Sequence, residues 1–466
     1  MKVDTEHQLY QKFSPLWQQA RDAVEGESAI KAKGEVYLGK QDGISETAYK
    51  NYKARARYPD FVAPAIEGLC GLMNRKVKPP VLPKGLQYLE DEATPEGLSL
   101  DDLRKRIESE VTTVGRIALF VDVLEQGGQP YIATYTAENI INWRREGDRL
   151  VMIVFYEEVE EVDLLDRFVT ETVPQWRVAA IEQEENGKEF YSVKVYRKVK
   201  NKDGVEDFIL HSETRPLRKG ETLSEVPAVI IGSRDIHPDP DAIPLMGVII
   251  KSLHYYRQYA DYAMQLFMCA NGTTPYITGA KKDEKPVTVG PTTIWQFEDS
   301  SAKAGFIEVS GSGLTAQKDE LDNIKSEIAY ATVRLLGDKK AAEAAETIRI
   351  RFQSQTATLS SITFACMAGL EASLVFCAEW AGEDPAGIEA IGTSEFITEE
   401  VNAQILTALY DGIERGLIPD DLLIEYTRRA ELHDYSPEDY RKWAAGLSAA
   451  GEPEKDEDGN PLEKEI

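Results

Sequence analysis

Apolar residues recur every three or four positions through the first quarter of the chain, a spacing that predicts amphipathic helices. Ser45 is placed to cap one of these helices, which Pro59 would end, because proline cannot continue a helix. Ser99 with Asp102 resembles a capping box at the start of another. The predicted helices span residues 6–24, Ser45 to about Tyr58, 60–75 and 100–113.

The pattern then changes to strict alternation of apolar and polar residues, which predicts strands between residue 114 and about residue 232. Asn186-Gly187 between two alternating runs is typical of a tight hairpin turn. We therefore expect a mostly antiparallel sheet. Its predicted strands are residues 116–123, 131–135, 150–156, 176–181, 191–199 and 208–211.

Long helices dominate the next part of the chain. A helix over 245–270, a compact β segment over 273–309 and a second helix over about 315–335 are predicted in that order. A short charged linker then leads into a helix of roughly 40 residues, or about 60 Å, over about 341–381. Small helices are expected over 399–415 and 420–431, with a last one opened by Ser436-Pro437. Together these elements predict an α+β protein.

Composition and charge restrict the kind of protein. The 466 residues carry 53 Lys and Arg against 80 Asp and Glu, a formal net charge of −27. Such acidity argues against a broad basic surface that coats nucleic acid, although DNA could still slide past the protein. Residues 395–466 hold 19 acids and 7 bases, a net −12, and residues 155–190 hold 11 acids and 3 bases, a net −8. The stretch 244–381 is more balanced, so a unit that meets a polyanion is expected there.

Sequence signals for a catalytic, metal or membrane site are weak. The four cysteines form no C-x-x-C pair, and we expect reduced thiols packed as small hydrophobes. No signal peptide, membrane span, phosphate-binding loop or nucleophile motif is predicted. The run His237, Asp239, Asp241 could suggest a metal site, but its two prolines favour a rigid, solvated linker. The acids Glu157, Glu158, Glu160 and Glu161 are interpreted as a solvent-facing strand edge. We find no catalytic site, and we expect no cofactor and no metal.

The order of these parts resembles the portal proteins of tailed bacteriophages. The resemblance covers residues 45–432 and is carried by several segments rather than by one motif. They are KARARYPDFVAPAIEGLCGLMNRK (53–76), TTVGRIALFVDV (112–123), FMCANGTTPYITG (267–279), AAEAAETIRIRFQSQTATLSSITFACMAGLEASL (341–374) and LTALYDGIERGLIPDDLLIEYTRRAEL (406–432).

This resemblance implies a fold with a wing, a two-helix stem, a clip, a tunnel loop, a long kinked helix and a helical crown. The implied boundaries are 1–244 for the wing, 245–270 and 314–335 for the stem helices, 271–313 for the clip, 336–345 for the tunnel loop, 346–382 for the long helix, 383–450 for the crown and 451–466 for a disordered acidic tail.

The resemblance also implies a function and a set of partners. It implies a ring of twelve subunits at one capsid vertex, through which double-stranded DNA enters and leaves. The terminase large subunit would dock on the clip, and a head-completion or adaptor protein would replace it. ATP hydrolysis would belong to the terminase, so this protein would not be an enzyme. Major capsid and scaffolding proteins are further implied partners. The location would be the virion, and the host cytoplasm during assembly, with no membrane partner.

Lysines of the second stem helix are candidates for the channel wall. Lys318 and Lys325 are seven residues apart and therefore share one helix face, so a ring would stack them as two basic circles. The alternative is that Lys318 pairs with Asp322, and Lys325 with Asp322 or Glu327, on a subunit surface. The sequence leaves both readings open.

The tunnel loop and the clip supply the other candidates. Lys339 and Lys340 fall in the tunnel loop, where basic rings would give phosphates sequence-independent contacts. The alanines that follow at once depart from the family pattern and leave open a shorter, partly helical loop. Trp295 and Phe297 alternate with polar residues in the clip, which favours β packing between subunits over a hot spot for another protein.

Two other classes of protein compete with a portal ring. One is a cytoplasmic α+β enzyme with an unrecognised active site, which should contain a deep pocket lined by perturbed titratable groups. The other is a different ring-forming head–tail connector, although adaptor proteins are usually far shorter than this chain.

Overall fold

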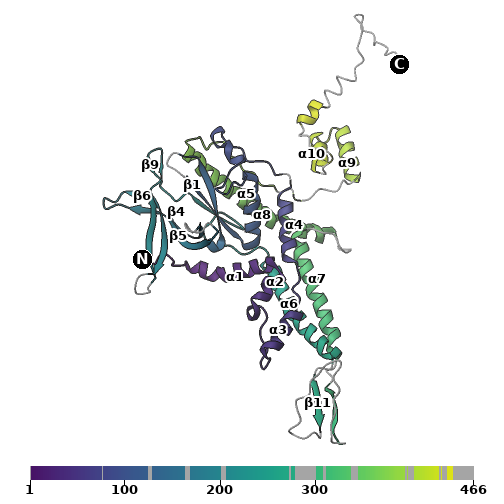
Figure 1. The fold of residues 1–466 in the computed structure, drawn as a ribbon. Helices are drawn as coiled ribbons and strands as arrows, with labels where there is room; N and C mark the ends of the chain where they lie inside the picture. The colour runs from purple at the N-terminus through teal and green to yellow at the C-terminus, as the bar shows by residue number, and fades with distance from the viewer. Residues whose placement is uncertain are drawn as a thin grey trace. The chain divides into compact units, whose positions relative to one another are not determined.

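The computed structural model describes most of the chain, and it divides into two units, Met1–Ser394 and Glu395–Ile466. The described residues are 2–75, 77–123, 128–162, 168–200, 206–271, 274–278, 301–307, 311–336, 345–393, 396, 403–429, 432 and 438–443. Helices and strands both contribute to the first unit (Figure 1), so the predicted α+β class is confirmed.

Side-chain caps explain where several helices begin. Ser45 accepts a hydrogen bond from the Ala48 amide and Ser99 accepts one from the Asp102 amide, as expected of N-cap serines. The third helix ends at Arg55, earlier than predicted, because Ala56 is already extended. The helices of the first unit are α1 (Gln8–Glu25), α2 (Glu27–Ala32), α3 (Glu46–Arg55), α4 (Val62–Met73), α5 (Leu100–Val114), α6 (Met246–Asn271), α7 (Leu314–Leu336) and α8 (Ala345–Ala381), with short 3₁₀ helices at Gly34–Val36, Lys84–Glu90, Ala137–Asn139 and Gly311–Gly313.

The strands form antiparallel sheets, as predicted, but two main sheets instead of one. A three-stranded sheet has the order β10-β1-β2 and a five-stranded sheet has the order β3-β4-β5-β6-β7, while β8 pairs with β9 and β11 with β12. The strands are β1 (Arg116–Val123), β2 (Pro130–Thr136), β3 (Ile140–Glu146), β4 (Arg149–Val162), β5 (Thr170–Gln183), β6 (Glu189–Lys200), β7 (Glu206–Thr214), β8 (Leu217–Arg218), β9 (Glu221–Thr222), β10 (Ala228–Gly232), β11 (Thr274–Thr278) and β12 (Lys303–Ile307).

Strands β3 and β10 were not among the predicted strands. β10 pairs with β1 in a register that joins Arg116 to Gly232 and Phe120 to Ala228. More than a hundred residues separate these partners, so the pairing depends on tertiary structure and not on a local pattern. The hairpin predicted at Asn186-Gly187 does join β5 to β6, with Gly187 at a φ of 82°.

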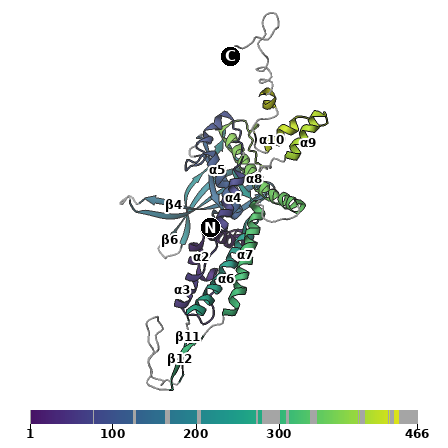
Figure 2. The ribbon, with the colours of Figure 1, turned by 90° about the vertical axis from the view of Figure 1, so that its right-hand side faces the viewer.

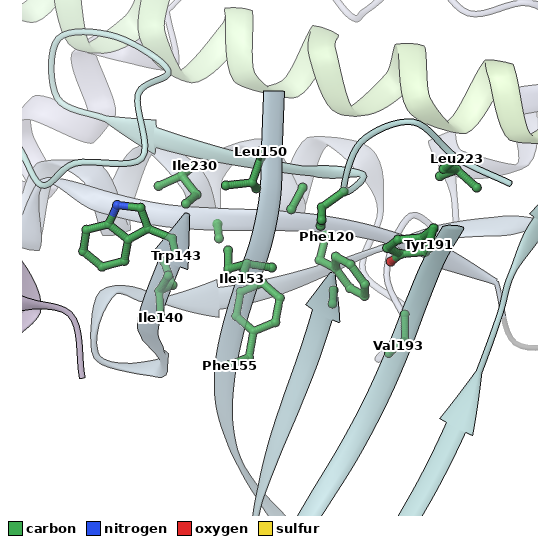
Figure 3. Packing of buried hydrophobic residues seen from close by; sticks show 14 residues of the cluster. Phe120, Ile140, Trp143, Leu150, Ile153, Phe155, Tyr191, Val193, Leu223 and Ile230 are labelled. Carbon is green, nitrogen blue, oxygen red and sulfur yellow. The ribbon is translucent and has the colours of Figure 1, made fainter. Parts of the chain in front are cut away.

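The main core lies between the two sheets, and Trp380 of α8 packs against it. Figure 3 shows Phe120, Phe155, Tyr191 and Val193 pointing into this layer, with a helix running across it. Tyr135 stacks on Phe155 with ring centroids 3.7 Å apart, which adds a defined aromatic contact to the apolar burial.

Helix α8 is apolar enough to pass a length and hydropathy test for a membrane span over Thr358–Ala381, the one such helix among the described residues. In this window 61% of the residues are buried inside the fold, and the helix packs on β1, β10 and α5. Core packing therefore accounts for its apolar character.

The loop that leads into α6 is anchored to the sheet. The Trp143 indole donates a hydrogen bond of 3.0 Å to Asp239, and the Arg116 guanidinium lies 4.1 Å from the indole ring centre. Arg116 also donates to the carbonyl of Pro238, and its burial lowers its pKa to about 9. Gly115 ends α5 with a φ of 77°, where a Cβ would lie 3.0 Å from the carbonyl oxygen of Ala242. These contacts set where α6 begins.

The described part of the second unit is helical. It contains α9 (Ala403–Glu414), α10 (Asp421–Arg429) and a helical stretch at 438–443, where a last helix was predicted, and Gly416, with a φ of 66°, follows α9. Residues 451–466, predicted to be a disordered tail, lie outside the described residues.

Candidate functional site

Helices α6 and α7 form an antiparallel arm. Lys251 near the start of α6 forms an ion pair with Glu327 near the end of α7. At the opposite end, a Cβ on Gly311, which precedes α7, would lie 3.9 Å from the Cys269 sulfur of α6. The 26 residues of α6 correspond to about 39 Å. Figures 1 and 2 both show the two helices side by side, with β11 and β12 beyond the end of the arm.

Each helix of the arm has one buried apolar stripe. The stripe of α6 faces the N-terminal part of the chain at Tyr256, whose ring centroid is 6.3 Å from that of Tyr58. The buried residues are Leu321, Ile324 and Ile328 of α7 and Ile249, Leu253, Tyr256 and Ala260 of α6.

Lys318 and Lys325 both lie on the exposed part of α7, but Lys325 has local partners. Its ammonium is 4.0 Å from the Asp322 carboxylate and 5.5 Å from the ring centre of Tyr255 on α6. The predicted alternative partner of Lys325, Glu327, is instead bound to Lys251, whose hydrogen bond lowers the pKa of Glu327. Lys325 therefore lies along the seam of the arm.

The exposed surface of α7 carries more acids than bases. Over residues 314–331 the exposed acids are Asp319, Glu320, Asp322 and Glu327, against the two lysines. Two lysines against four acids give this surface a net negative formal charge, so it attracts phosphates at the lysines and repels them elsewhere.

The N-terminal helices brace the arm, a contact that the sequence pattern did not predict. The Tyr52 hydroxyl donates a 2.6 Å hydrogen bond to Asp261 of α6, and the Gln41 amide donates to the same oxygen at 3.3 Å. Arg257 donates to the carbonyl of Tyr37 at 2.8 Å, and the Arg55 guanidinium lies 3.8 Å from the ring centre of Phe267. Asp261 thus anchors α3 to α6.

Several predicted site residues lie outside the described part of the chain. These are the tunnel-loop lysines Lys339 and Lys340 and the clip aromatics Trp295 and Phe297. Their roles, and the boundaries of the tunnel loop, stay predictions.

The interpretation of the glutamate run as a solvent-facing edge was wrong for Glu157. Its side chain is 13% exposed and faces the core side of β4, two positions after Phe155. Arg177 donates to Glu157 at 2.6 Å, and Tyr135 and Gln175 each donate to it at 2.6 Å. Glu158, Glu160 and Glu161 are exposed, because β4 runs beyond the core there.

A second carboxylate faces the same guanidinium. Asp122, at the end of β1, has its Oδ2 atom 4.0 Å from Nη1 of Arg177. Burial raises the pKa of Asp122, whereas hydrogen bonds from Arg177, Tyr135 and Gln175 outweigh burial and lower the pKa of Glu157. The strand register that faces these groups toward one another is not visible in the sequence.

The sequence His237, Asp239, Asp241 does not converge on a common point. Asp239 accepts from Trp143 and Asp241 accepts from the Arg234 amide. Among the residues that the structure describes, no group of three or more His, Cys, Asp or Glu could hold a metal ion.

Residues 244–381 match a family described as a domain of unknown function, DUF4055, which covers less than half of the chain. No curated protein matches.

Among solved structures, a chain in the virion of a native gene transfer agent (GTA) particle is 13% identical, with a TM-score of 0.35, over 85% of this chain and 97% of that chain. A chain in the neck of an empty GTA particle, computed with C6 symmetry, is 14% identical, with a TM-score of 0.36, over 86% and 98%. A chain in the neck of a native GTA particle, computed with C12 symmetry, is 13% identical, with a TM-score of 0.34, over 78% and 89%. TM-scores this low assign neither fold nor role.

Proposed function

We propose that the protein is the subunit of a portal ring, which sits at one capsid vertex of a tailed phage or phage-like particle and conducts double-stranded DNA. The observation that carries the proposal is the antiparallel arm formed by α6 and α7. The chain segment that connects these two helices contains the paired strands β11 and β12. This arm is inserted in the chain between an α+β body and the long core helix α8. The same order of parts underlies the sequence resemblance to portal proteins.

The surface of the arm supports association with copies of itself. Ile250 and Leu266 on α6 and Tyr330 on α7 are each about half exposed in the single chain. A ring of identical subunits covers such residues, because each arm then packs between two neighbours. The arms would line the channel as its stem, and the β hairpin as its clip.

The charge distribution supports passage of DNA without tight binding. In a ring of twelve, the four exposed acids of α7 would repeat around the axis. The cationic positions would be Lys318 and Lys325 of α7, together with Lys339 and Lys340. Weak, salt-sensitive contacts of this kind hold DNA without stopping it.

The remaining parts take the roles implied by the resemblance. The clip would dock the terminase large subunit and later a head-completion or adaptor protein, with Trp295 and Phe297 packing between subunits. The wing would contact major capsid and scaffolding proteins, and ATP hydrolysis would belong to the terminase. The predicted domain boundaries are part of this proposal.

The decisive experiment is to determine the mass and shape of the purified full-length chain by mass photometry and negative-stain imaging. Twelve chains of 52.1 kDa form a ring of about 0.6 MDa with an axial hole. A ring of thirteen also supports the proposal, whereas a monodisperse monomer or dimer under all conditions overturns it.

A matched pair of variants tests the role of the arm. Ile250→Glu should reduce ring formation while the subunit stays folded, since Ile250 is exposed in the single chain. Ile236→Glu, at a similarly exposed isoleucine in the loop before α6, should assemble like the natural chain. Equal assembly by both variants would contradict packing of neighbours through this face of α6.

A further inference from the structure

A pocket of about 450 Å³ opens on the core-side face of the five-stranded sheet, in a part of the body far along the chain from the arm. Strands β5, β6 and β7 contribute Arg177, Val193, Val195, Ser212 and Thr214 to it, and the ends of β1 and β2 contribute Asp122 and Tyr131. This volume falls within the usual range of small-molecule sites.

The inner wall carries an uncompensated negative charge. Arg177 lies between two carboxylates, Glu157 at 2.6 Å and Asp122 at 4.0 Å, so the three groups together carry one excess negative charge. Glu157 receives three hydrogen bonds, one of them from Arg177, while Asp122 accepts hydrogen bonds from the Val123 amide at 2.8 Å and from the Tyr131 hydroxyl. Asp122 thus shares the Arg177 guanidinium, at 4.0 Å, with the more closely bonded Glu157.

At the rim of the pocket, a second arginine also lies near two carboxylates. Arg215 lies 3.3 Å from a carboxylate oxygen of Glu213 and 4.0 Å from one of Glu184, and its guanidinium stacks 4.1 Å from the ring centre of Phe190. The neighbouring ion pair of Lys194 and Glu182, whose charged atoms are 2.7 Å apart, adds no net charge. Each of the two arginines that line the pocket therefore lies near two carboxylates.

A buried hydroxyl beside the pocket also lacks a partner. Tyr191 is 1% exposed, and its hydroxyl oxygen has no hydrogen-bond partner within the described part of the chain. Strand alternation puts its side chain on the same face of β6 as Val193 and Val195, which line the pocket. An unpaired buried hydroxyl costs free energy, so a ligand donor near it would be stabilising.

Val193, Val195, Pro216 and Leu217 add apolar side chains to the lining, beside the hydroxyls of Ser212 and Thr214. These apolar side chains accommodate methylene groups.

We propose that this pocket binds an aliphatic ammonium ion, whose methylene chain packs on the valines and whose ammonium group reaches Asp122. The ammonium balances the second of the two carboxylates that share Arg177, and a second ammonium would meet the acids at the rim. The source is either a free polyamine or the lysine side chain of another protein. This inference does not depend on the proposed portal function.

The test is calorimetric titration of the full-length chain with 1,5-diaminopentane, with 1,5-pentanediol as a neutral ligand of the same length. The diamine should bind saturably and the diol should not. Asp122→Asn should weaken binding of the diamine at least tenfold, whereas Glu160→Gln, at an exposed acid of the same sheet, should leave it unchanged. Ser212→Phe places a large side chain in the pocket from an exposed position and should abolish binding while the fold is retained, as judged by thermal melting.

A second titration with Nα-acetyl-lysine amide separates the two sources. Binding of the diamine alone identifies a free polyamine as the ligand, and binding of both compounds at similar affinity identifies a lysine side chain. Failure of both to bind, or equal binding of diamine and diol, would overturn the proposal.

Discussion

The hydroxyl of Tyr52 donates a 2.6 Å hydrogen bond to the Asp261 carboxylate, and this contact joins the N-terminal helix α3 to the middle of α6. Burial and the hydrogen bond to Asp261 raise the pKa of Tyr52, so the phenol stays protonated and remains a donor at any ordinary pH. The arm is therefore braced from its side by a segment that precedes it by about two hundred residues.

Removal of the Tyr52 hydroxyl should weaken the contact between α3 and α6. Tyr52→Phe leaves the Asp261 carboxylate with Gln41 as its remaining partner from the N-terminal part, and should destabilise the chain by about 1–2 kcal/mol. Hydrogen exchange should rise in α3 and in the facing part of α6. Tyr262→Phe, one residue after Asp261 on the same helix, provides the control and should leave the exchange of α3 unchanged. If α3 exchanged at the same rate in both variants, the Tyr52 hydroxyl would not hold α3 against α6.

Close approach of α8 to the sheet should depend on Gly369. A Cβ at this position would lie 2.3 Å from Cγ1 of Ile231, a fully buried residue of β10 that has no room to move. Gly369→Ala should therefore destabilise the chain by about 1–3 kcal/mol, although alanine is the better helix former. The measurement is the free energy of unfolding in urea.

Gly71→Ala is the matched control for this substitution. Gly71 lies in α4, is exposed, and has nothing within 4 Å of an added Cβ. The change should be neutral or stabilise by up to about 1 kcal/mol. If Gly369→Ala behaved in the same way, the helix and sheet would be less tightly packed than the distances indicate.

The buried ion pair inside α5 should contribute much more to the stability of the chain than the exposed ion pair beside it. Nη1 of Arg104 lies 2.9 Å from a carboxylate oxygen of Glu108, and both side chains are at most 5% exposed. Arg104→Met would leave Glu108 buried without its cation and should cost about 3–5 kcal/mol. Lys105→Met removes an exposed pair with Asp101 and should cost far less, because solvent screens that pair. Chemical denaturation of both variants measures the difference, and similar losses would contradict burial of Glu108.

Glu157 should make the stability of the body depend on pH. Although burial alone would raise it, hydrogen bonds from Arg177 and its neighbours hold the pKa of Glu157 below its ordinary value of 4.5. A depressed pKa means that the folded chain favours the carboxylate, so this stabilisation is present at neutral pH and is lost as the pH falls below about 4.5.

Glu157→Gln should thus destabilise the chain by about 1–3 kcal/mol at pH 7, and by progressively less on acidification below pH 4.5. Urea unfolding between pH 3.5 and 7 measures this trend. Glu160→Gln should track the natural chain throughout. A difference for Glu157→Gln that does not change with pH would show that its carboxylate is not selectively stabilised in the fold.

The tunnel-loop lysines should affect DNA and not assembly. Lys339→Ala combined with Lys340→Ala removes two cations per subunit from the proposed constriction, and should reduce DNA retention or packaging while rings still form. Lys12→Ala combined with Lys50→Ala removes two exposed cations from the body and is the control. Unchanged packaging would rule out these residues as the DNA contact.

Local patterns were sufficient to predict most of the helices and strands of this protein, although not β3 or β10. Helical spacing and capping serines predicted α3 and α5, and the apolar stripe of α7 is buried at Leu321, Ile324 and Ile328. Alternation and Asn186-Gly187 predicted the β5–β6 hairpin. These features succeed because caps, turns and amphipathic faces depend on residues within about one helical turn or one hairpin of each other.

The sequence by itself thus determined the α+β class, most helices and strands, and the order of body, arm and long helix. Tertiary structure alone decided that β10 joins β1, that Tyr52 reaches Asp261, and that Asp122, Glu157 and Arg177 meet beside a pocket. The reason is that these partners lie far apart along the chain, so their meeting depends on strand register and helix packing. Glu157 shows this most directly, since neighbouring glutamates on the same strand are exposed while its own carboxylate is held by three donors.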